Sequence, residues 1–398
     1  MIDKPKQAVI LAGGIGTRLS PLTKDFAKPM INICGKPFLE HIVLFLKKNN
    51  FKKILFVVGY KNKSISNYFG DGKKWNLSFS YNITPDHYKT GLRIKNARSQ
   101  IEENFFLLYC DNYCQLNLDE MWNDFKERKN PIMITVYKDF ENKIKNNINL
   151  NSNGIVTSYD KDRKTKKNFL DIGFMFLKKE VIYGLTTKNI SFEDYLFKNF
   201  LKKNQISAFI TYQKYFSIGS LSRLKETNEF FKRKKIIFLD RDGVVNVKPP
   251  KAKYVKSWKD WKWMPNIFED LKQLIDNGFN IIIISNQAGI GRKIMSELDL
   301  KKIHEIMNAY LIHNGSSIMD IFYCPHNWDE GCFCRKPKAG LFFIAQKKYN
   351  INLAETYFIG DDSRDEIAAK KAGCKFFMVN KKQKLRDLVK LIVSEKNG

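Results

Sequence analysis

The sequence predicts an α/β protein built from two successive domains. Apolar runs of strand length alternate with amphipathic, helix-like stretches along the whole chain, and this alternation is typical of sheets covered by helices. The pattern restarts at "KKIIFLDRDG", next to the charged, helix-like stretch "RLKETNEFFKRKK". The 398 residues, of which 43% are hydrophobic, are enough for two separate cores. We therefore predict one domain at residues 1–232 and a second at residues 233–398.

The expected elements follow the same strand-first order in both domains. In the first domain we expect strands at 8–13 ("AVILAG"), 53–59 ("KILFVVG") and 105–111 ("FFLLYCD"), and a helix at 38–50. In the second domain we expect strands at 234–243, 280–289 and 355–362, and a helix at 266–278. Each domain opens with a strand and a loop rich in glycine or aspartate, which suggests two active sites on one chain.

The chain is strongly basic, with a formal net charge of +28. Clustered lysines and arginines would suggest a nucleic-acid partner because they neutralise phosphates, but here the lysines are spread over both halves. The sequence also has no helix-turn-helix, zinc-finger spacing or base-stacking motif. We therefore favour a solvated lysine-rich surface over nucleic-acid binding. Such a surface attracts phosphorylated small molecules over long distances.

Nothing in the sequence indicates export or a membrane span. No apolar run approaches the roughly 20 residues of a membrane helix, and the first residues lack a signal-peptide pattern. We therefore expect a cytoplasmic protein without membrane insertion. The seven cysteines are unevenly spaced, which in this setting favours reduced thiols or metal ligation over a disulfide framework. Whether the chain forms a homo-oligomer stays open.

A glycine-rich loop follows the first expected strand. In "LAGGIGTRL", Gly13, Gly14 and Gly16 allow backbone N–H groups to approach an anion closely. Arg18 in the same loop can bind phosphate through two hydrogen bonds, and Lys28 in "FAKPM" adds a second cation. A glycine turn after a strand is often only a turn, but the two cations favour a phosphate-binding loop.

The stretch "LAGGIGTRLSPLTKDFAKPM" resembles the signature of the nucleoside-diphosphate-sugar pyrophosphorylases, which are nucleotidyltransferases built on a Rossmann-like sheet. The resemblance extends over about residues 7–222. It implies that the glycine loop, Arg18 and Lys28 bind a nucleoside triphosphate. It also implies that Asp111, which follows a central strand, binds Mg²⁺. In this family a sugar phosphate attacks the α-phosphorus, so no protein nucleophile is needed.

Three further residues of the first domain are interpreted through the same resemblance. "YDKD" places Lys161 at the sugar phosphate, and "SFEDYLF" places Glu193 against sugar hydroxyls. For these two, a solvated lysine and a helix-capping carboxylate are the alternatives. Ser217 in "YFSIGS" is a departure, because the family usually carries a second metal-binding aspartate there. An active transferase and a binding module that has lost catalysis are therefore both open.

Two aspartates follow the first strand of the second domain. In "IIFLDRDGVVN", Asp240 and Asp242 lie two residues apart, and such a pair is costly to bury without a cation. The alternative is a turn in which the aspartates cap neighbouring N–H groups. The motif resembles the first motif of the haloacid dehalogenase phosphatases, whose domain is also Rossmann-like. The remaining motifs follow in order over about residues 235–380.

The resemblance implies a role for each of these motifs. Asp240 would attack phosphorus, and Asp242 would protonate the leaving oxygen and later activate water. Ser285 and Asn286 would bind the phosphate. Lys336 would neutralise the transferring phosphoryl group.

The resemblance also implies a Mg²⁺ site in the second domain, so that both domains use this cation. Its ligands would be Asp240, Asp361 and the backbone carbonyl of Asp242. Asp365 would be a further partner of the metal site, with a solvated helix residue as the equal alternative.

Three cysteines and a histidine lie close together just before Lys336. They can supply the three thiolates and one imidazole of a closed tetrahedral zinc site. The four residues are Cys324, His326, Cys332 and Cys334. Reduced cysteines that merely cluster are the alternative. A structural Zn²⁺ ion would fold a loop too short for its own core and would hold Arg335 and Lys336 toward the phosphates.

The motifs "DRDGVVN", "SNQAGIGR" and "CPH…CFCRKPKAG" together resemble the heptose 1,7-bisphosphate phosphatase branch of that superfamily. The resemblance implies that Arg335 contacts a substrate phosphate or hydroxyl. Asp362 is a departure, because this branch often has a cation at that position.

The two resemblances imply consecutive reactions. Removal of the 7-phosphate yields a heptose 1-phosphate, and the first domain is most similar to the D-glycero-α-D-manno-heptose 1-phosphate guanylyltransferases. The implied partners are sugar phosphates and a nucleoside triphosphate, with GTP favoured and GDP-heptose as the product. This interpretation rests on analogy. Another base, another sugar phosphate, or a phosphatase fused to an inactive nucleotide-sugar-binding module stay open.

Overall fold

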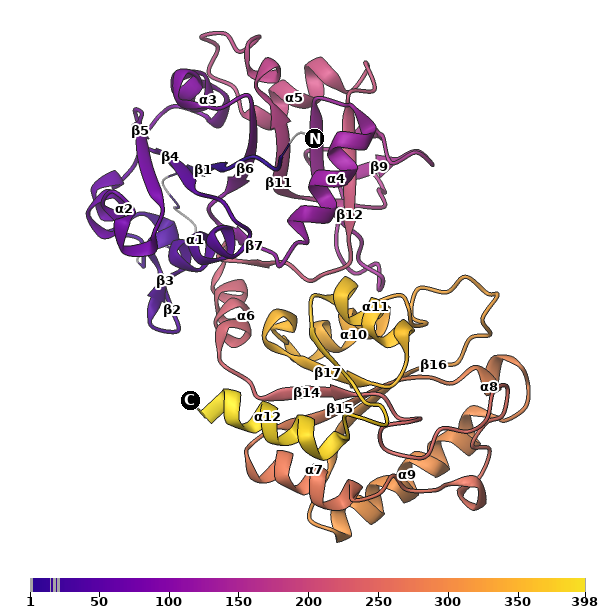
Figure 1. Cartoon of the computed structure of the whole chain (residues 1–398). Helices are drawn as coiled ribbons and strands as arrows, with labels where there is room; N and C mark the ends of the chain where they lie inside the picture. The colour runs from indigo at the N-terminus through magenta and orange to yellow at the C-terminus, as the bar shows by residue number, and fades with distance from the viewer. Residues whose placement is uncertain (1–2, 15, 17–18, 20–21, 398) are drawn as a thin grey trace. The chain divides into compact units, whose positions relative to one another are not determined.

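The computed structural model describes residues 3–14, 16, 19 and 22–397. The chain folds as two compact units, Met1–Phe231 and Lys232–Gly398 (Figure 1). Each unit is an α/β domain, so the fold class predicted from the alternating strand-like and helix-like stretches is confirmed. Arg18 lies outside the described residues.

The first unit is built on a seven-stranded mixed sheet. Its strands, in spatial order, are β12 (Ile206–Thr211), β8 (Ile132–Tyr137), β11 (Leu170–Lys178), β6 (Asn104–Tyr109), β1 (Gln7–Ala12), β4 (Lys53–Val58) and β5 (Ser78–Ile83). All neighbours pair in parallel except β11, which is antiparallel to both β6 and β8. Every residue of β1 is buried, because helices cover both faces of the sheet.

In the described part of the first unit, six α-helices cover this sheet. Four of them pack on one face: α1 (Phe38–Lys48), α2 (Asn62–Phe69), α4 (Leu118–Arg128) and α6 (Leu221–Phe231). Two pack on the other: α3 (Thr90–Ala97) and α5 (Phe192–Phe200). Three two-stranded ribbons complete the unit: β2 (Asn32–Ile33) with β3 (Lys36–Pro37), β9 (Ile148–Leu150) with β10 (Val156–Tyr159), and β7 (Asn112–Tyr113) with β13 (Phe216–Ser217).

The second unit is built on a five-stranded parallel sheet. Its strands, in spatial order, are β16 (Ile318–Cys324), β15 (Asn280–Asn286), β14 (Ile236–Leu239), β17 (Tyr357–Gly360) and β18 (Lys375–Met378). Its helices are α7 (Ile267–Asp276), α8 (Ala288–Gly291), α9 (Glu297–His313), α10 (Gly340–Tyr349), α11 (Ser363–Ala372) and α12 (Leu385–Asn397). The two units also contain short 3₁₀ helices at Lys28–Met30, Lys73–Trp75, Arg98–Gln100, Lys179–Ile182, Trp258–Asp260 and Leu353–Glu355.

The strand order places one functional edge in each sheet. In the first unit the chain runs from β1 outward to β4 and β5, and it later returns to the other side of β1 with β6. In the second unit the chain runs from β14 to β15 and β16, and it returns to the other side of β14 with β17. Ligands of such sheets bind at the carboxyl ends of the strands beside this reversal. The expected sites therefore follow β1 and β14, where the sequence has its glycine loop and its aspartate pair.

Among the described residues, no helix is both long enough and apolar enough to span a lipid bilayer.

Candidate active sites

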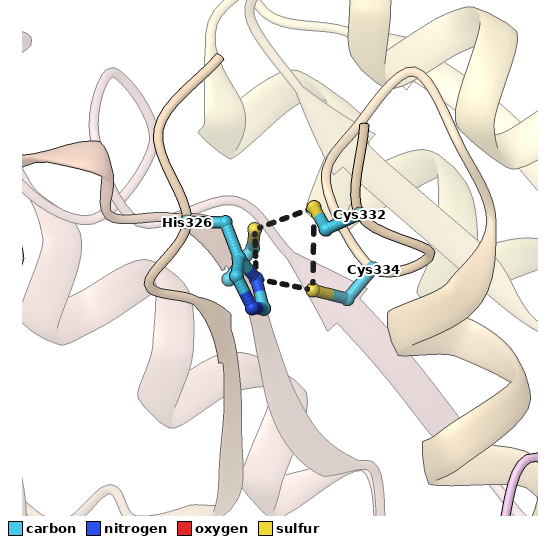
Figure 2. Close-up of side chains that lie close together, drawn as sticks. His326, Cys332 and Cys334 are labelled. Carbon is cyan, nitrogen blue, oxygen red and sulfur yellow. Dashed lines mark hydrogen bonds between the residues drawn. The ribbon is translucent and has the colours of Figure 1, made fainter. Parts of the chain in front are cut away.

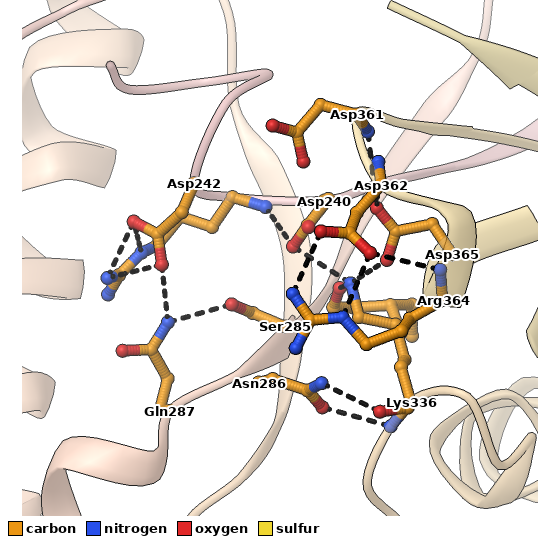
Figure 3. A network of polar contacts seen from close by, with 12 residues as sticks. Asp240, Asp242, Ser285, Asn286, Gln287, Lys336, Asp361, Asp362, Arg364 and Asp365 are labelled. Atoms are coloured by element: carbon orange, nitrogen blue, oxygen red, sulfur yellow. Dashed lines mark hydrogen bonds and ion pairs between the residues drawn. The ribbon is translucent and has the colours of Figure 1, made fainter. Parts of the chain in front are cut away.

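The acidic residues of the second unit meet at the carboxyl edge of its sheet (Figure 3). Asp240 follows β14, and Asp361 follows the neighbouring strand β17. One oxygen from each, together with one from Asp365 in α11, lie within 4.8 Å of one another. Gly243 passes so close that a Cβ on it would lie 2.2 Å from the Asp361 carboxylate. The three carboxylates thus form a group of hard oxygen ligands that could hold a divalent cation.

Lys336 lies between two of these carboxylates. Its Nζ is 3.0 Å from Asp240 Oδ1 and 2.7 Å from Asp365 Oδ1. It also donates a hydrogen bond of 2.9 Å to the carbonyl of Ile284. Only 2% of Lys336 is exposed. Burial raises the pKa of Asp240 to about 8, and the charge of Lys336 acts against that rise. One buried ammonium therefore offsets part of the repulsion among the carboxylates.

Asp242 turns its side chain away from Asp240 toward Gln287 (Figure 3). Its carboxylate pairs with Arg241 at 2.9 Å and accepts hydrogen bonds from Asn246 at 2.9 Å and Gln287 at 3.0 Å. Burial alone would raise the pKa of Asp242, but the charge of Arg241 and these hydrogen bonds lower it below its ordinary value. The charge of Arg241 and these hydrogen bonds therefore favour the ionised form of Asp242, which is the form that accepts a proton as a general base.

Ser285 and Asn286, the last residues of β15, contact protein groups. The amide of Asn286 donates to the backbone carbonyl of Lys336 at 3.1 Å and accepts from its backbone N–H at 3.0 Å. Ser285 Oγ accepts a hydrogen bond of 2.8 Å from Gln287. Asn286 thus fixes the backbone of Lys336, whereas the sequence predicts that it binds phosphate.

The three cysteines and the histidine before Lys336 converge on one point (Figure 2). Cys324 Sγ lies 3.5 Å from His326 Nδ1 and 3.6 Å from Cys332 Sγ. Cys334 Sγ lies 3.2 Å from the same nitrogen and 3.7 Å from Cys332 Sγ. Ligands around a tetrahedral zinc ion would be about 3.5–3.8 Å apart. The donor set and its spacing therefore fit a metal ion of this kind.

The same loop is attached to the strand-end residues by backbone hydrogen bonds. The N–H of Gln287 donates to the carbonyl of Cys324, and the N–H of Gly291 donates to that of Pro325, both at 2.8 Å. Lys338 Nζ donates to the carbonyls of Gly331 and Cys332. The first two of these bonds hold the loop against α8. The last cysteine of the loop, Cys334, is two residues before Lys336.

A cavity of about 660 Å³ opens beside Asp240 and Lys336. It is ringed by cationic side chains, which are Lys248, Lys251, Lys253, Arg335 and Arg364. Lys248 Nζ lies 2.9 Å from Asp361 Oδ2 and 3.2 Å from Asp362 Oδ2. Arg364 pairs with Asp362 at 2.8 Å, and this hydrogen bond holds the pKa of Asp362 well below its ordinary value. Arg364 thus places a cation beside Asp362 at the rim of the cavity.

The first unit has a cavity of about 690 Å³ at the carboxyl end of β1. It brings together six of the predicted residues, which are Gly13, Gly14, Gly16, Lys28, Asp111 and Glu193. Lys28 Nζ lies 2.7 Å from Asp111 Oδ2. Gly16 has φ +71°, and a Cβ on it would lie 2.8 Å from the Cβ of Lys28. The glycine loop therefore packs directly against the cation that the sequence assigns to the phosphates.

Lys161 and Glu193 lie near one another at the start of α5. Lys161 pairs with Asp194 at 2.7 Å, which raises the pKa of Lys161. Ser191 is the residue that caps α5, because its hydroxyl accepts from the N–H of Asp194. Burial raises the pKa of Glu193, and the charge of Lys161 opposes that effect. Glu193 is thus not the helix cap but a partly buried carboxyl group that lines the cavity.

Ser217 lies beside the predicted metal ligand of this cavity. Strand β13 pairs with β7 so that Ser217 is opposite Asn112, and the N–H of Ile218 donates to the carbonyl of Asp111 at 3.1 Å. The hydroxyl of Ser217 accepts a hydrogen bond of 3.3 Å from Arg223 in α6. Position 217 therefore has a serine hydroxyl bonded to Arg223, and not a second carboxylate.

The chain matches known families over both units. Residues 7–234 match the nucleotidyl transferase family, and residues 235–384 match the polynucleotide kinase 3 phosphatase family. The chain belongs to the nucleotidyl transferase family.

Curated relatives extend this result to the second unit. A D-glycero-β-D-manno-heptose-1,7-bisphosphate 7-phosphatase from Haemophilus ducreyi is 38% identical, over 36% of this chain and 80% of the relative. A D-glycero-α-D-manno-heptose-1,7-bisphosphate 7-phosphatase from Photorhabdus laumondii is 37% identical, over 35% of this chain and 78% of the relative. The second unit belongs to the same phosphatase family as these proteins.

The first unit has a curated relative as well. A D-glycero-α-D-manno-heptose 1-phosphate guanylyltransferase from Campylobacter jejuni is 31% identical, over 49% of this chain and 87% of the relative. The chain is thus an enzyme of two parts, a nucleotidyltransferase followed by a phosphatase.

The residues near the two sites that are absent from the sequence prediction include Arg93, Arg223, Arg241, Lys248 and His304. Arg241 is 1% exposed and lies 3.3 Å from His304, whose pKa burial lowers to about 3. Arg241 could have been noticed, since a charge between two aspartates that are predicted to be catalytic must be buried with them. Arg93 is four residues before the buried Ala97, which places it on the apolar side of its helix.

Proposed function

We propose that the chain catalyses two consecutive steps toward GDP-heptose. The second unit removes the 7-phosphate of D-glycero-α-D-manno-heptose 1,7-bisphosphate, and the first unit transfers GMP from GTP to the resulting heptose 1-phosphate. The observation that carries the proposal is that one chain joins relatives of both enzymes. The phosphatase relative is named for removing the 7-phosphate of heptose 1,7-bisphosphate, and this reaction yields the heptose 1-phosphate for which the transferase relative is named. We choose the α anomer because the transferase relative's name specifies it.

In the phosphatase step, a carboxylate oxygen of Asp240 attacks phosphorus and the bond to the sugar oxygen breaks, which leaves an aspartyl phosphate. Asp242, once it has taken up a proton from solvent, gives this proton to the leaving oxygen and, ionised again, later takes one from the water that hydrolyses the intermediate. Lys336, held 3.0 Å from Asp240, is placed to neutralise the phosphoryl oxygens. The cationic rim of the cavity suits a substrate with two phosphates.

Mg²⁺ would be held in the second unit by Asp240 and Asp361, with Asp365 beside them. When bound, it would reduce the repulsion between the nucleophile and the phosphate. Asp111 would be the carboxylate ligand in the first unit. Sites for this cation commonly use only one or two carboxylates and take other ligands from phosphates and water.

In the transferase step, an oxygen of the sugar phosphate attacks the α-phosphorus of GTP and pyrophosphate leaves. The loop at Gly13, Gly14 and Gly16 would bind the triphosphate through backbone N–H groups, with Lys28 and Arg18 as counter-charges. Glu193 would accept hydrogen bonds from the sugar, and Lys161 would contact its phosphate. An unreactive nucleotide-sugar-binding module is the second candidate for this unit, because Arg223 donates to Ser217 where the family has a carboxylate.

The nucleophile assignment is tested with Asp240→Asn. This variant should release less than about 1% of wild-type phosphate from the bisphosphate, since an amide cannot form the aspartyl phosphate. Its melting temperature should stay close to that of wild type because Lys336 keeps its contact with Asp365. Asp276→Asn, at an exposed position of α7, is the control and should retain full activity. Phosphate release by a folded Asp240→Asn protein above a few per cent would refute the assignment.

The Cys324, His326, Cys332 and Cys334 site is tested by metal analysis. We propose that it binds one structural Zn²⁺ ion, which supports the backbone leading to Lys336. Protein purified without chelator should contain one equivalent of zinc, and Cys332→Ser should lose it. Phosphate release should fall about tenfold or more as Lys336 loses its support, while transfer of GMP to heptose 1-phosphate should be unchanged. Cys374→Ser, in the same unit but outside the cluster, should keep its zinc. Absence of zinc from the wild-type protein would exclude the site.

The role of Ser217 is tested by Mg²⁺ titration of pyrophosphate release. Wild type should be active with a raised Mg²⁺ requirement, and Ser217→Asp should reach its half-maximal rate at a lower concentration. A tenfold difference in rate at limiting Mg²⁺ corresponds to about 1.4 kcal/mol. Because Arg223 could pair with the new carboxylate, the effect should be larger when Arg223→Ala is added.

Ser222→Asp places the same charge on the exposed face of α6 and should leave the Mg²⁺ curve unchanged. If wild type releases no pyrophosphate at any Mg²⁺ concentration while Ser217→Asp does, the binding-module function is correct. If the two curves coincide, Ser217 does not face the metal.

A further inference from the structure

Arg93 in α3 is a buried arginine at the edge of the nucleotide cavity, and only 3% of it is exposed. Its guanidinium donates hydrogen bonds to three separate parts of the chain. The acceptors are the backbone carbonyls of Gly13, Val58, Asp86 and Tyr88, at 2.8–3.2 Å, and the hydroxyl of Thr84. One side chain thus connects the glycine loop, the end of β4 and the segment 84–88 that forms a wall of the cavity.

All of these acceptors are uncharged. Among the described residues, no carboxylate lies within ion-pair distance of Arg93, and Asp86 contacts it through its backbone carbonyl. Burial lowers the pKa of Arg93, and the charge of Asp86 offsets only part of this effect. Buried charges are usually paired, because an unpaired one is costly to remove from water. Within the described part of the chain, the charge of Arg93 is therefore without a carboxylate partner.

The guanidinium lies directly against the glycine loop. A Cβ on Gly13 would be 2.4 Å from Arg93 Cζ, and a Cβ on Gly59 would be 2.3 Å from its Nη1. A Cβ on Gly14 would meet no atom within 4 Å. The guanidinium of Arg93 thus fits only because position 13 has no side chain, whereas a side chain at position 14 would meet open space.

We propose that Arg93 is a positioning residue of the nucleotide site and that its buried charge is a fixed counter-charge for the polyphosphate of the substrate. The guanidinium holds the glycine loop by the carbonyl of Gly13, so the loop's N–H groups and the positive charge act on the same anion. Little water separates the charge from that anion, and its effect is therefore larger than that of a surface lysine. This inference rests on the proposed nucleotidyl transfer, and it names the part of the nucleotide that Arg93 serves.

A purely architectural role makes a different prediction from a role of the charge. Arg93→Met removes both the charge and the hydrogen bonds. Arg93→Lys keeps the charge but cannot reproduce five hydrogen bonds in a fixed plane. If the charge matters, lysine should restore most of the affinity for a polyphosphate that methionine loses. If only the bonds matter, the two variants should be equally impaired.

The test is calorimetric titration of the full chain with inorganic tripolyphosphate and with GTP, without Mg²⁺ and at constant ionic strength. Arg93→Met should bind both probes about tenfold or more weakly than wild type, by a similar factor. Arg93→Lys should bind tripolyphosphate within about threefold of wild type. Arg98→Met removes an exposed charge just beyond the same helix and should change neither affinity. Binding at the phosphatase cavity is common to all variants and cancels in the comparison.

Each outcome decides the inference. Equal affinities for tripolyphosphate in wild type, Arg93→Met and Arg93→Lys overturn it, and so does an equal loss in both variants. Should Arg93→Met fail to fold, the comparison of wild type with Arg93→Lys remains, and a loss of affinity beyond about tenfold in a folded Arg93→Lys protein overturns the inference. A wild-type chain that binds tripolyphosphate but transfers no GMP would refute the proposed function and leave the role of Arg93 standing.

Discussion

The ion pairs of Lys336 with Asp240 and Asp365 are the interactions on which the phosphatase half depends. The ammonium is almost fully buried, so water does not screen its charge from either carboxylate. If both carboxylates were lost, Lys336 would be left as an uncompensated buried charge, which typically costs about 3–5 kcal/mol. The backbone of Lys336 is held by Asn286, and the Cys and His loop two residues earlier is attached to α8. The loop and the strand end therefore both keep a cation next to Asp240, the proposed nucleophile.

The transferase half also holds cations next to its proposed phosphate site, but with different residues. Its anion site follows β1, at the point where the strand order reverses, as the phosphatase site follows β14. Lys28 pairs with Asp111 at 2.7 Å, and Arg93 lies beneath the glycine loop with only neutral acceptors. In both halves a fixed cation is thus present before a phosphate arrives. Such preorganisation avoids the cost of reorienting charges when the substrate binds.

The sequence was sufficient to predict which residues lie together where reactive residue types occur at strand ends or close to one another in the chain. Asp240 and Asp361 follow strands, Ser285 lies at the end of one, and the four cluster residues lie within eleven positions, so their proximity could be inferred. The role of Asn286 in holding Lys336 could not, because its partners are backbone atoms fifty positions away. Arg93 was missed for a similar reason, since its acceptors are carbonyls of distant segments, and a single arginine in a helix resembles a surface residue. Arg18 lies outside the described residues, so its predicted phosphate contact stays a prediction.

The most direct test of the two-step account is one reaction in which the chain receives heptose 1,7-bisphosphate, GTP and Mg²⁺ while phosphate and pyrophosphate are measured separately. The account predicts that phosphate appears first, that pyrophosphate follows after a lag, and that ATP, CTP or UTP gives little pyrophosphate. In the Asp240→Asn protein both products should be absent, and added heptose 1-phosphate should restore pyrophosphate alone. Pyrophosphate formed from the bisphosphate without prior phosphate release, or by Asp240→Asn without added heptose 1-phosphate, would contradict the account.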